Sequence, residues 1–111
     1  MALGFSLGVV TTSAQPRVDF GRAWPPPEGA ACQPRPREIE IAVTLFELGK
    51  TAFREKHYAR AFELFRDAYT NDCRAVMLLG NIAKVLEADG HYAEALEVLD
   101  LYVARKHPSG D

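Results

Sequence analysis

The sequence is poor in the features that mark several common classes of protein. It has only two cysteines in 111 residues, too few for a disulfide-rich scaffold. The formal net charge is −2, whereas a surface that binds nucleic acid needs a strongly basic field. No apolar run reaches the roughly 18 residues that a membrane-spanning helix requires. We therefore expect neither a nucleic-acid partner nor a membrane span.

Signatures of catalysis and of cofactor binding are also missing from the sequence. None of the three histidines, His57, His91 and His107, stands four residues from another, and none has a cysteine at metal-ligand spacing. The sequence has no Gly-rich phosphate loop and no nucleophile elbow. We expect no enzyme activity, no catalytic residue, no metal and no cofactor, with His57 and His91 as solvated turn residues.

A short phrase occurs twice in the chain, 34 residues apart: HYARAFE at 57–63 and HYAEALE at 91–97. At this spacing, 42–75 aligns with 76–109. The identical pairs are Leu45/Leu79, Lys50/Lys84, His57/His91, Tyr58/Tyr92, Ala59/Ala93, Ala61/Ala95 and Glu63/Glu97. A 34-residue period is typical of a helix–turn–helix repeat, in which small residues allow the two helices to approach closely. Gly49, Ala61, Ala83 and Ala95 have the expected size.

These residues resemble the tetratricopeptide repeat (TPR) family over about 67 of the 111 residues. The matching positions are Leu48-Gly49, Tyr58, Ala61, Phe65 and Ala68 in the first unit, and Ile82-Ala83, Tyr92, Ala95 and Leu99 in the second. The chain departs from the family at Cys73, where a proline usually ends the unit, and at Tyr102, where a small residue is usual. The resemblance implies an all-α fold of two stacked helix–turn–helix hairpins. The alternative is an ordinary antiparallel four-helix bundle in which the identities at 34-residue spacing are coincidental.

The pattern predicts a helical domain over 37–108, preceded by a Pro-rich linker over 15–36 that holds six of the seven prolines. Because proline fixes φ and lacks an N–H donor, we expect the linker to be extended. Helices are expected at about 36–55, 58–70, 74–88 and 92–106. Trp24 is the exception to a pure linker, and we expect it to dock on the outer face of the first helix.

The first 14 residues resemble a secretory signal that lacks its basic start, with a cleavage point after Ala14. This favours an exported, periplasmic location over a cytoplasmic one, and the alternative is a disordered apolar N-terminus. Cys32 precedes the first helix and Cys73 lies between the two units, so both fall at the same end of the stack. Export would favour a disulfide between them, whereas the alternative is two free thiols.

Stacked hairpins expose their first helices along a concave groove. The resemblance implies a protein or peptide partner and places Phe46, Lys50, Phe53, Asn81 and Lys84 in that groove. The two lysines recur at equivalent positions beside Asn81, which predicts recognition of an acidic group; a solvated helix face is the alternative. Leu99, Tyr102 and Val103 on the last helix have no following helix to cover them, which predicts a partner surface or a homodimer. The function is therefore either peptide binding in the groove or self-association as an assembly subunit.

Overall fold

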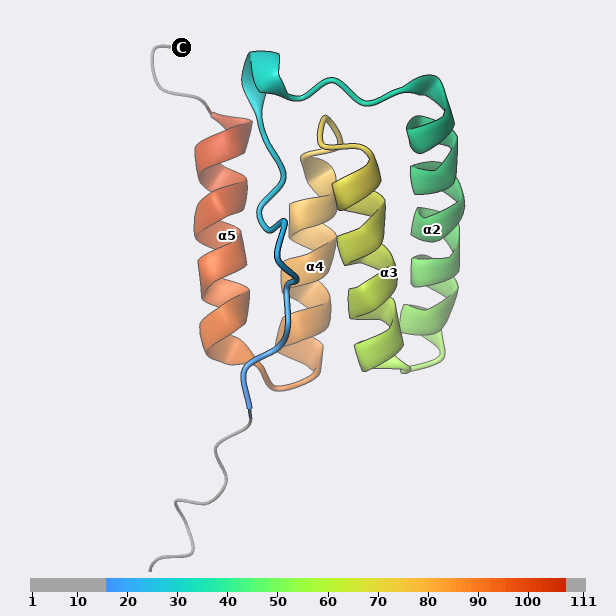
Figure 1. The fold of residues 1–111 in the computed structure, drawn as a ribbon. Coiled ribbons are helices and arrows are strands. Elements are labelled where there is room, and N and C mark those ends of the chain that lie inside the picture. The colour runs from blue at the N-terminus through green and yellow to red at the C-terminus, as the bar shows by residue number, and fades with distance from the viewer. Residues whose placement is uncertain (1–15, 108–111) are drawn as a thin grey trace, which may run out of the picture.

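The computed structural model describes residues 16–107, and its regular elements are all helical (Figure 1). The elements are the short 3-10 helix η3 (Gly29–Ala31) and the α-helices α2 (Pro36–Arg54), α3 (Tyr58–Asn71), α4 (Met77–Ala88) and α5 (Tyr92–Lys106). Three of the four predicted helices match the observed bounds within one residue at each end. Within 16–107 no helix is both long and apolar enough to cross a membrane. The proposed signal at 1–14 lies outside the described residues.

The two turns inside the hairpins share one hydrogen-bond geometry at the 34-residue spacing. The His57 N–H donates to the carbonyl of Ala52 at 2.9 Å, and the His91 N–H donates to that of Leu86 at 2.8 Å. The residue before each histidine has a positive φ, +64° at Lys56 and +82° at Gly90. This left-handed residue ends a helix by turning the chain so that its last carbonyls find donors. The repeat in the sequence is therefore also a repeat in backbone structure.

The connection between the hairpins differs from the prediction, because α4 begins at Met77 rather than near Arg74. The Asp72 carboxylate accepts the backbone N–H of Arg74 at 3.1 Å and its guanidinium at 3.0 Å. This contact holds residues 72–74 in a turn and lowers the pKa of Asp72, against the opposing effect of desolvation. Asp72 therefore ends α3 and orients Cys73, but it does not cap α4, whose N-cap residue is Val76.

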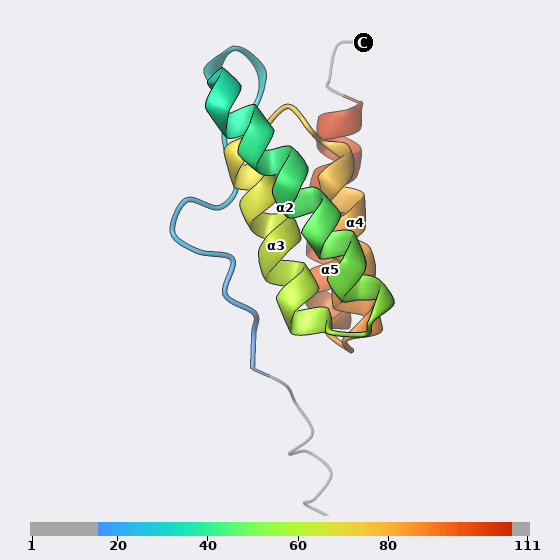
Figure 2. The same cartoon turned by 90° about the vertical axis from the view of Figure 1, so that its right-hand side faces the viewer.

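The helices pack in chain order, α2 on α3, α3 on α4 and α4 on α5. Figure 2 shows the hairpins stacked side by side, in agreement with the predicted all-α fold of two helical hairpins. The buried core is dominated by α3 and α4, and its most enclosed large side chains are Tyr69, Leu79, Ile82, Leu86, Val85 and Val98. At Gly49 a Cβ atom would lie 2.6 Å from the Phe65 ring, so the close approach of α2 and α3 requires glycine there.

Residues 16–35, here called the strap, are extended as predicted but do not form a free linker. Figure 1 shows the strap running lengthwise between α5 and α4 in this view and then passing over the end of the bundle to α2. Val18, Phe20 and Trp24 pack against the hydrophobic core. Trp24 lies on Tyr69 of α3, with ring centroids 5.9 Å apart, so its expected place on the first helix is wrong. The reason is that the strap, which leads into α2, crosses the end of the bundle and lies on α3 and α5, the second helices of the two hairpins.

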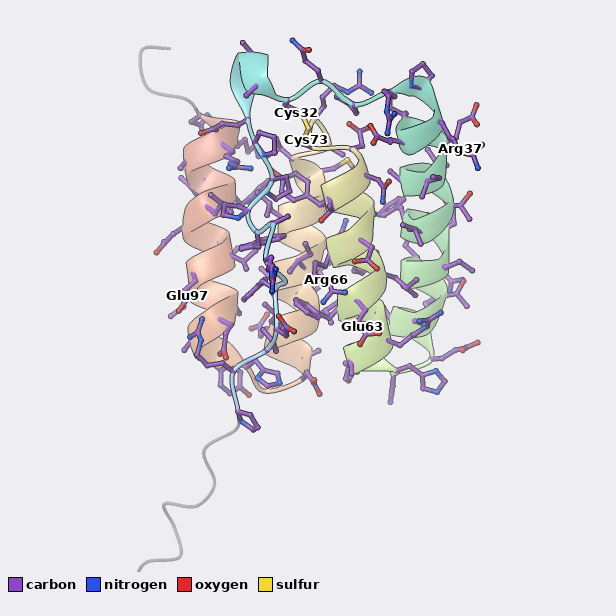
Figure 3. The ribbon with its side chains drawn as sticks, viewed as in Figure 1. Cys32, Arg37, Glu63, Arg66, Cys73 and Glu97 are labelled. Atoms are coloured by element: carbon purple, nitrogen blue, oxygen red, sulfur yellow. A yellow bond between two sulfur atoms is a disulfide. The ribbon has the colours of Figure 1, made fainter. Side chains whose placement is uncertain are left out.

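Cys32 at the end of the strap and Cys73 in the α3–α4 connection form a disulfide, with Cα atoms 5.9 Å apart (Figure 3). This confirms the predicted pairing. It fixes the strap to the end of the bundle where α2 begins and α3 ends, because one hairpin returns the chain to the level at which it started.

Candidate functional site

The first helices of the two hairpins, α2 and α4, border a hollow of about 230 Å³. Four of the five residues predicted for the groove line it: Lys50, Phe53, Asn81 and Lys84. Arg54 lines the same hollow, and Phe65 and Val85 form apolar parts of its wall. The structure thus brings together side chains that lie up to 35 residues apart in the sequence.

Phe46, the fifth predicted groove residue, lines a neighbouring hollow of about 100 Å³ with Val43 and Met77. The two hollows are linked through Lys50, whose ammonium lies 4.7 Å from the centre of the Phe46 ring. The same ammonium pairs with Glu47 at 3.2 Å. Lys50 is therefore held over the groove by one aromatic contact and one exposed ion pair, both of which are weak enough to be exchanged for a ligand.

The charge of the hollow between α2 and α4 has one sign. Lys50, Arg54 and Lys84 line it, and no carboxylate does so among the described residues. The Arg54 guanidinium donates to the Thr51 hydroxyl at 3.2 Å, which is a neutral partner. Three cations beside the Asn81 amide and the Phe53 ring can accept an anionic group together with an apolar side chain. Nothing in this geometry resembles a nucleophile paired with a base.

The outer face of α5 carries the residues predicted for a partner surface. Leu99 and Val103 are 40% and 58% exposed, whereas Tyr102 is half-buried. Tyr102 is partly covered because it packs toward Gly80 on α4, in the space that a larger residue there would fill. Leu99 lines a hollow of about 400 Å³ between α4 and α5, together with Lys84 and Glu87.

Sequence analysis missed two residues of this α5 face. Tyr92 and Leu96 are 66% and 63% exposed, and both line the hollow that contains Leu99. The signal was present in the spacing, because residues 92, 96, 99 and 103 recur every three or four positions and so lie along one stripe of a helix. Tyr58, the equivalent residue of the first hairpin, packs against the core and on Phe53, so the repeat by itself gives no sign that Tyr92 is exposed.

The histidines behave differently at the two turns. His57 is exposed as expected, but the His91 side chain is only 13% exposed and lies 3.6 Å from Asp89 and 4.0 Å from Glu94. The solvated-turn prediction is therefore wrong for His91. Among residues 16–107, no group of three potential metal ligands comes together.

Comparison of this chain with protein-family models, with curated proteins and with solved structures finds no match.

Proposed function

We propose that this protein is a non-catalytic TPR module that binds an extended, acidic segment of a partner protein in the groove between α2 and α4. The observation that carries the proposal is the convergence of Lys50, Lys84 and Asn81 on one hollow that no described carboxylate lines. The repeated turn geometry at 34-residue spacing supports the assignment to the TPR type.

Each groove residue has a distinct role in this proposal. Lys50 and Lys84 supply ammonium groups from consecutive first helices and attract a carboxylate from two sides. The Asn81 amide offers a donor and an acceptor to the backbone of the ligand. Phe53 and the neighbouring Phe46 provide apolar surface for side chains next to the acidic group. Specificity then comes from the spacing between the acidic group and the apolar residues of the ligand.

Binding of fluorescein-labelled peptides with acidic C-terminal residues, drawn from a library, tests this proposal. We expect Lys50→Glu and Lys84→Glu each to weaken the selected peptide roughly tenfold, the loss of one charge-assisted contact. Lys56→Glu is the matched control, because Lys56 lies in the exposed α2–α3 turn and the charge change is the same. Equal affinities of all three variants would show that the groove is not the binding site.

The exposed stripe of α5 supports a second candidate function, self-association as an assembly subunit. Its four apolar side chains form a continuous surface of the kind that marks protein interfaces. Light scattering after size-exclusion chromatography, over a concentration series of the full chain, should show a dimer that Leu99→Lys and Val103→Lys dissociate. Leu48→Lys is the control, because Leu48 is equally apolar and 49% exposed but lies on α2. A wild-type monomer at every concentration would remove this candidate.

A further inference from the structure

The strap packs between the second helices α3 and α5, whereas the proposed peptide site lies mainly between α2 and α4 and takes only Phe65 from α3. Phe20 packs edge-on against Phe62 of α3, with ring centroids 5.4 Å apart, and Trp24 packs on Tyr69. Arg66 donates to the carbonyl of Asp19 at 2.9 Å. The groove between α3 and α5 therefore holds an extended segment through aromatic side chains and one main-chain hydrogen bond.

Ion pairs with α5 hold the two ends of this contact. Arg17 pairs with Glu97 at 2.9 Å, which lowers the pKa of the Glu97 carboxyl. At the other end the Glu28 carboxylate lies 3.6 Å from Nε of Arg105. Figure 3 shows Glu97 on α5 and Arg66 on α3, the two helices that border the strap. The Arg17–Glu97 pair is exposed and Glu28 is largely so, and exposed pairs contribute little to stability.

The Cys32–Cys73 disulfide lies in the wall of a hollow of about 750 Å³. Arg74, Arg105 and His107 line the same hollow. Cys32 is half-buried and Cys73 is only 8% exposed, so a small thiol that enters the hollow meets the disulfide from the Cys32 side. Glu28 lines this hollow too, and Arg105 and Arg74 are paired with Glu28 and Asp72, so charges of both signs surround the disulfide.

We propose that reduction of the Cys32–Cys73 disulfide releases the strap and opens the α3/α5 groove as a second binding surface. The ligand that fits this surface is an extended peptide of the strap's own chemistry. It carries two aromatic residues four positions apart, a following proline, and charged residues that reach Glu97 and Arg105. In the oxidised protein the strap occupies the groove and excludes such a ligand.

The reductant in this step is a dithiol. Its thiolate attacks one sulfur of the disulfide and forms a mixed disulfide, and its second thiol then displaces the protein sulfur. Two electrons and two protons end on Cys32 and Cys73 as thiols, and the reductant leaves as its own disulfide. The intact helices take no part in this exchange.

After reduction the strap is attached covalently to the bundle only where it joins α2, and this allows its release. The strap joins α2 through residues 33–35, at the side of the bundle away from α5, and the disulfide is the covalent link that holds its base to the α3–α4 connection. Without that link, the aromatic contacts, the Arg66–Asp19 hydrogen bond and the two ion pairs with α5 must by themselves offset the chain entropy lost by ordering the strap. The groove left behind exposes Phe62 and Tyr69, which are almost fully buried beneath the strap and its neighbours.

The probe for this surface is a labelled synthetic peptide with the sequence of residues 16–31. We expect it to bind the reduced full chain, and the Cys32→Ser/Cys73→Ser variant, at least tenfold more tightly than the oxidised chain. Fluorescence of Trp24, the only tryptophan, should shift to longer wavelength on reduction, and amide exchange in α3 and α5 should accelerate. A peptide with serine at both aromatic positions is the control and should not bind.

A second variant tests the groove without changing the disulfide. Phe20→Asp should undock the strap of the oxidised chain and allow the peptide to bind, and Arg66→Gln should weaken that binding. The Lys50→Glu/Lys84→Glu variant should bind the strap peptide normally, which separates this site from the groove between α2 and α4.

Three results would overturn the proposal. Unchanged Trp24 emission and amide exchange on reduction would show that the strap stays docked. A released strap without peptide binding, in the reduced chain and in Phe20→Asp, would show that the groove is no binding site. Loss of the helical circular dichroism signal on reduction would overturn the proposal that the disulfide controls strap release. Peptide binding by oxidised Phe20→Asp would then decide by itself whether the α3/α5 groove is a binding surface.

Discussion

Substituting Gly49 by alanine tests how closely α2 and α3 approach. In an ordinary helix interior this change stabilises a protein by about 1 kcal/mol, because glycine loses more backbone entropy on folding. Here the added Cβ would lie 2.6 Å and 2.7 Å from two carbons of the Phe65 ring, well inside ordinary contact distance. Phe65 is only 3% exposed and packs against Phe46, so its ring can shift only at the expense of these core contacts.

The clash outweighs the gain in helix propensity. Overpacking of a dense core costs about 1–3 kcal/mol, and a required shift of nearly 1 Å places this site near the upper end of that range. We therefore expect Gly49→Ala to destabilise the protein by about 2 kcal/mol. For a domain of this size, that corresponds to a fall in Tm of about 10 °C.

The second hairpin provides the design of the control. At the positions equivalent to Gly49 and Phe65 it has Ala83 and Leu99. There the larger alanine on the first helix faces a leucine, which is smaller than phenylalanine, on the second helix. Phe65→Leu alone should cost about 1 kcal/mol through lost burial. In that background Gly49→Ala should become neutral or stabilising, so the two substitutions are coupled by roughly 2–3 kcal/mol. The assay is thermal and urea unfolding of the four proteins under oxidising conditions, followed by far-ultraviolet circular dichroism. A stabilising Gly49→Ala in the wild-type background would refute the close-approach argument.

Two further predictions concern the turns. Lys56 has a left-handed φ of +64°, so Lys56→Gly should raise the free energy of unfolding by about 0.5–1 kcal/mol. Gly90→Ala, at the equivalent turn, should lower the free energy of unfolding by about 1 kcal/mol. Urea titration measures both changes, and equal effects of one sign would contradict the shared turn geometry. Asp72 has a folded-state pKa below its ordinary value of 3.8, so its contribution to stability is complete above that pH and is lost as the pH falls through the folded pKa. Asp72→Asn should therefore lower the free energy of unfolding by about 1 kcal/mol near neutral pH, and the variant should lose less stability in acid than the wild type. If the free energy of unfolding of the two proteins changed in parallel with pH, Asp72 would not be the responsible group.

The helical elements could be predicted because their determinants are local. Each determinant lies within a few residues of the element that it specifies. These determinants are the left-handed turn residues at 56 and 90, Pro36 at the start of α2, and the apolar spacing within each helix. The resemblance to the TPR family also implied which positions of α2 and α4 would lie beside one hollow, and Lys50, Asn81 and Lys84 do so. The late start of α4 was not predicted, because it depends on Asp72 binding Arg74 instead of capping the helix.

The sequence by itself determined the helices, their pairing in hairpins, and the placement of both cysteines at one end of the stack. Only the tertiary structure decided the course of the strap, because extended Pro-rich chain carries no periodicity that points to a partner. Its position depends on whether Phe20 and Trp24 find aromatic neighbours on helices more than thirty residues away. The same holds for the exposed stripe on α5, since burial of Tyr92 and Leu96 depends on whether another element lies beside them. Short-range patterns specify elements, whereas contacts between distant segments specify which faces remain free to bind.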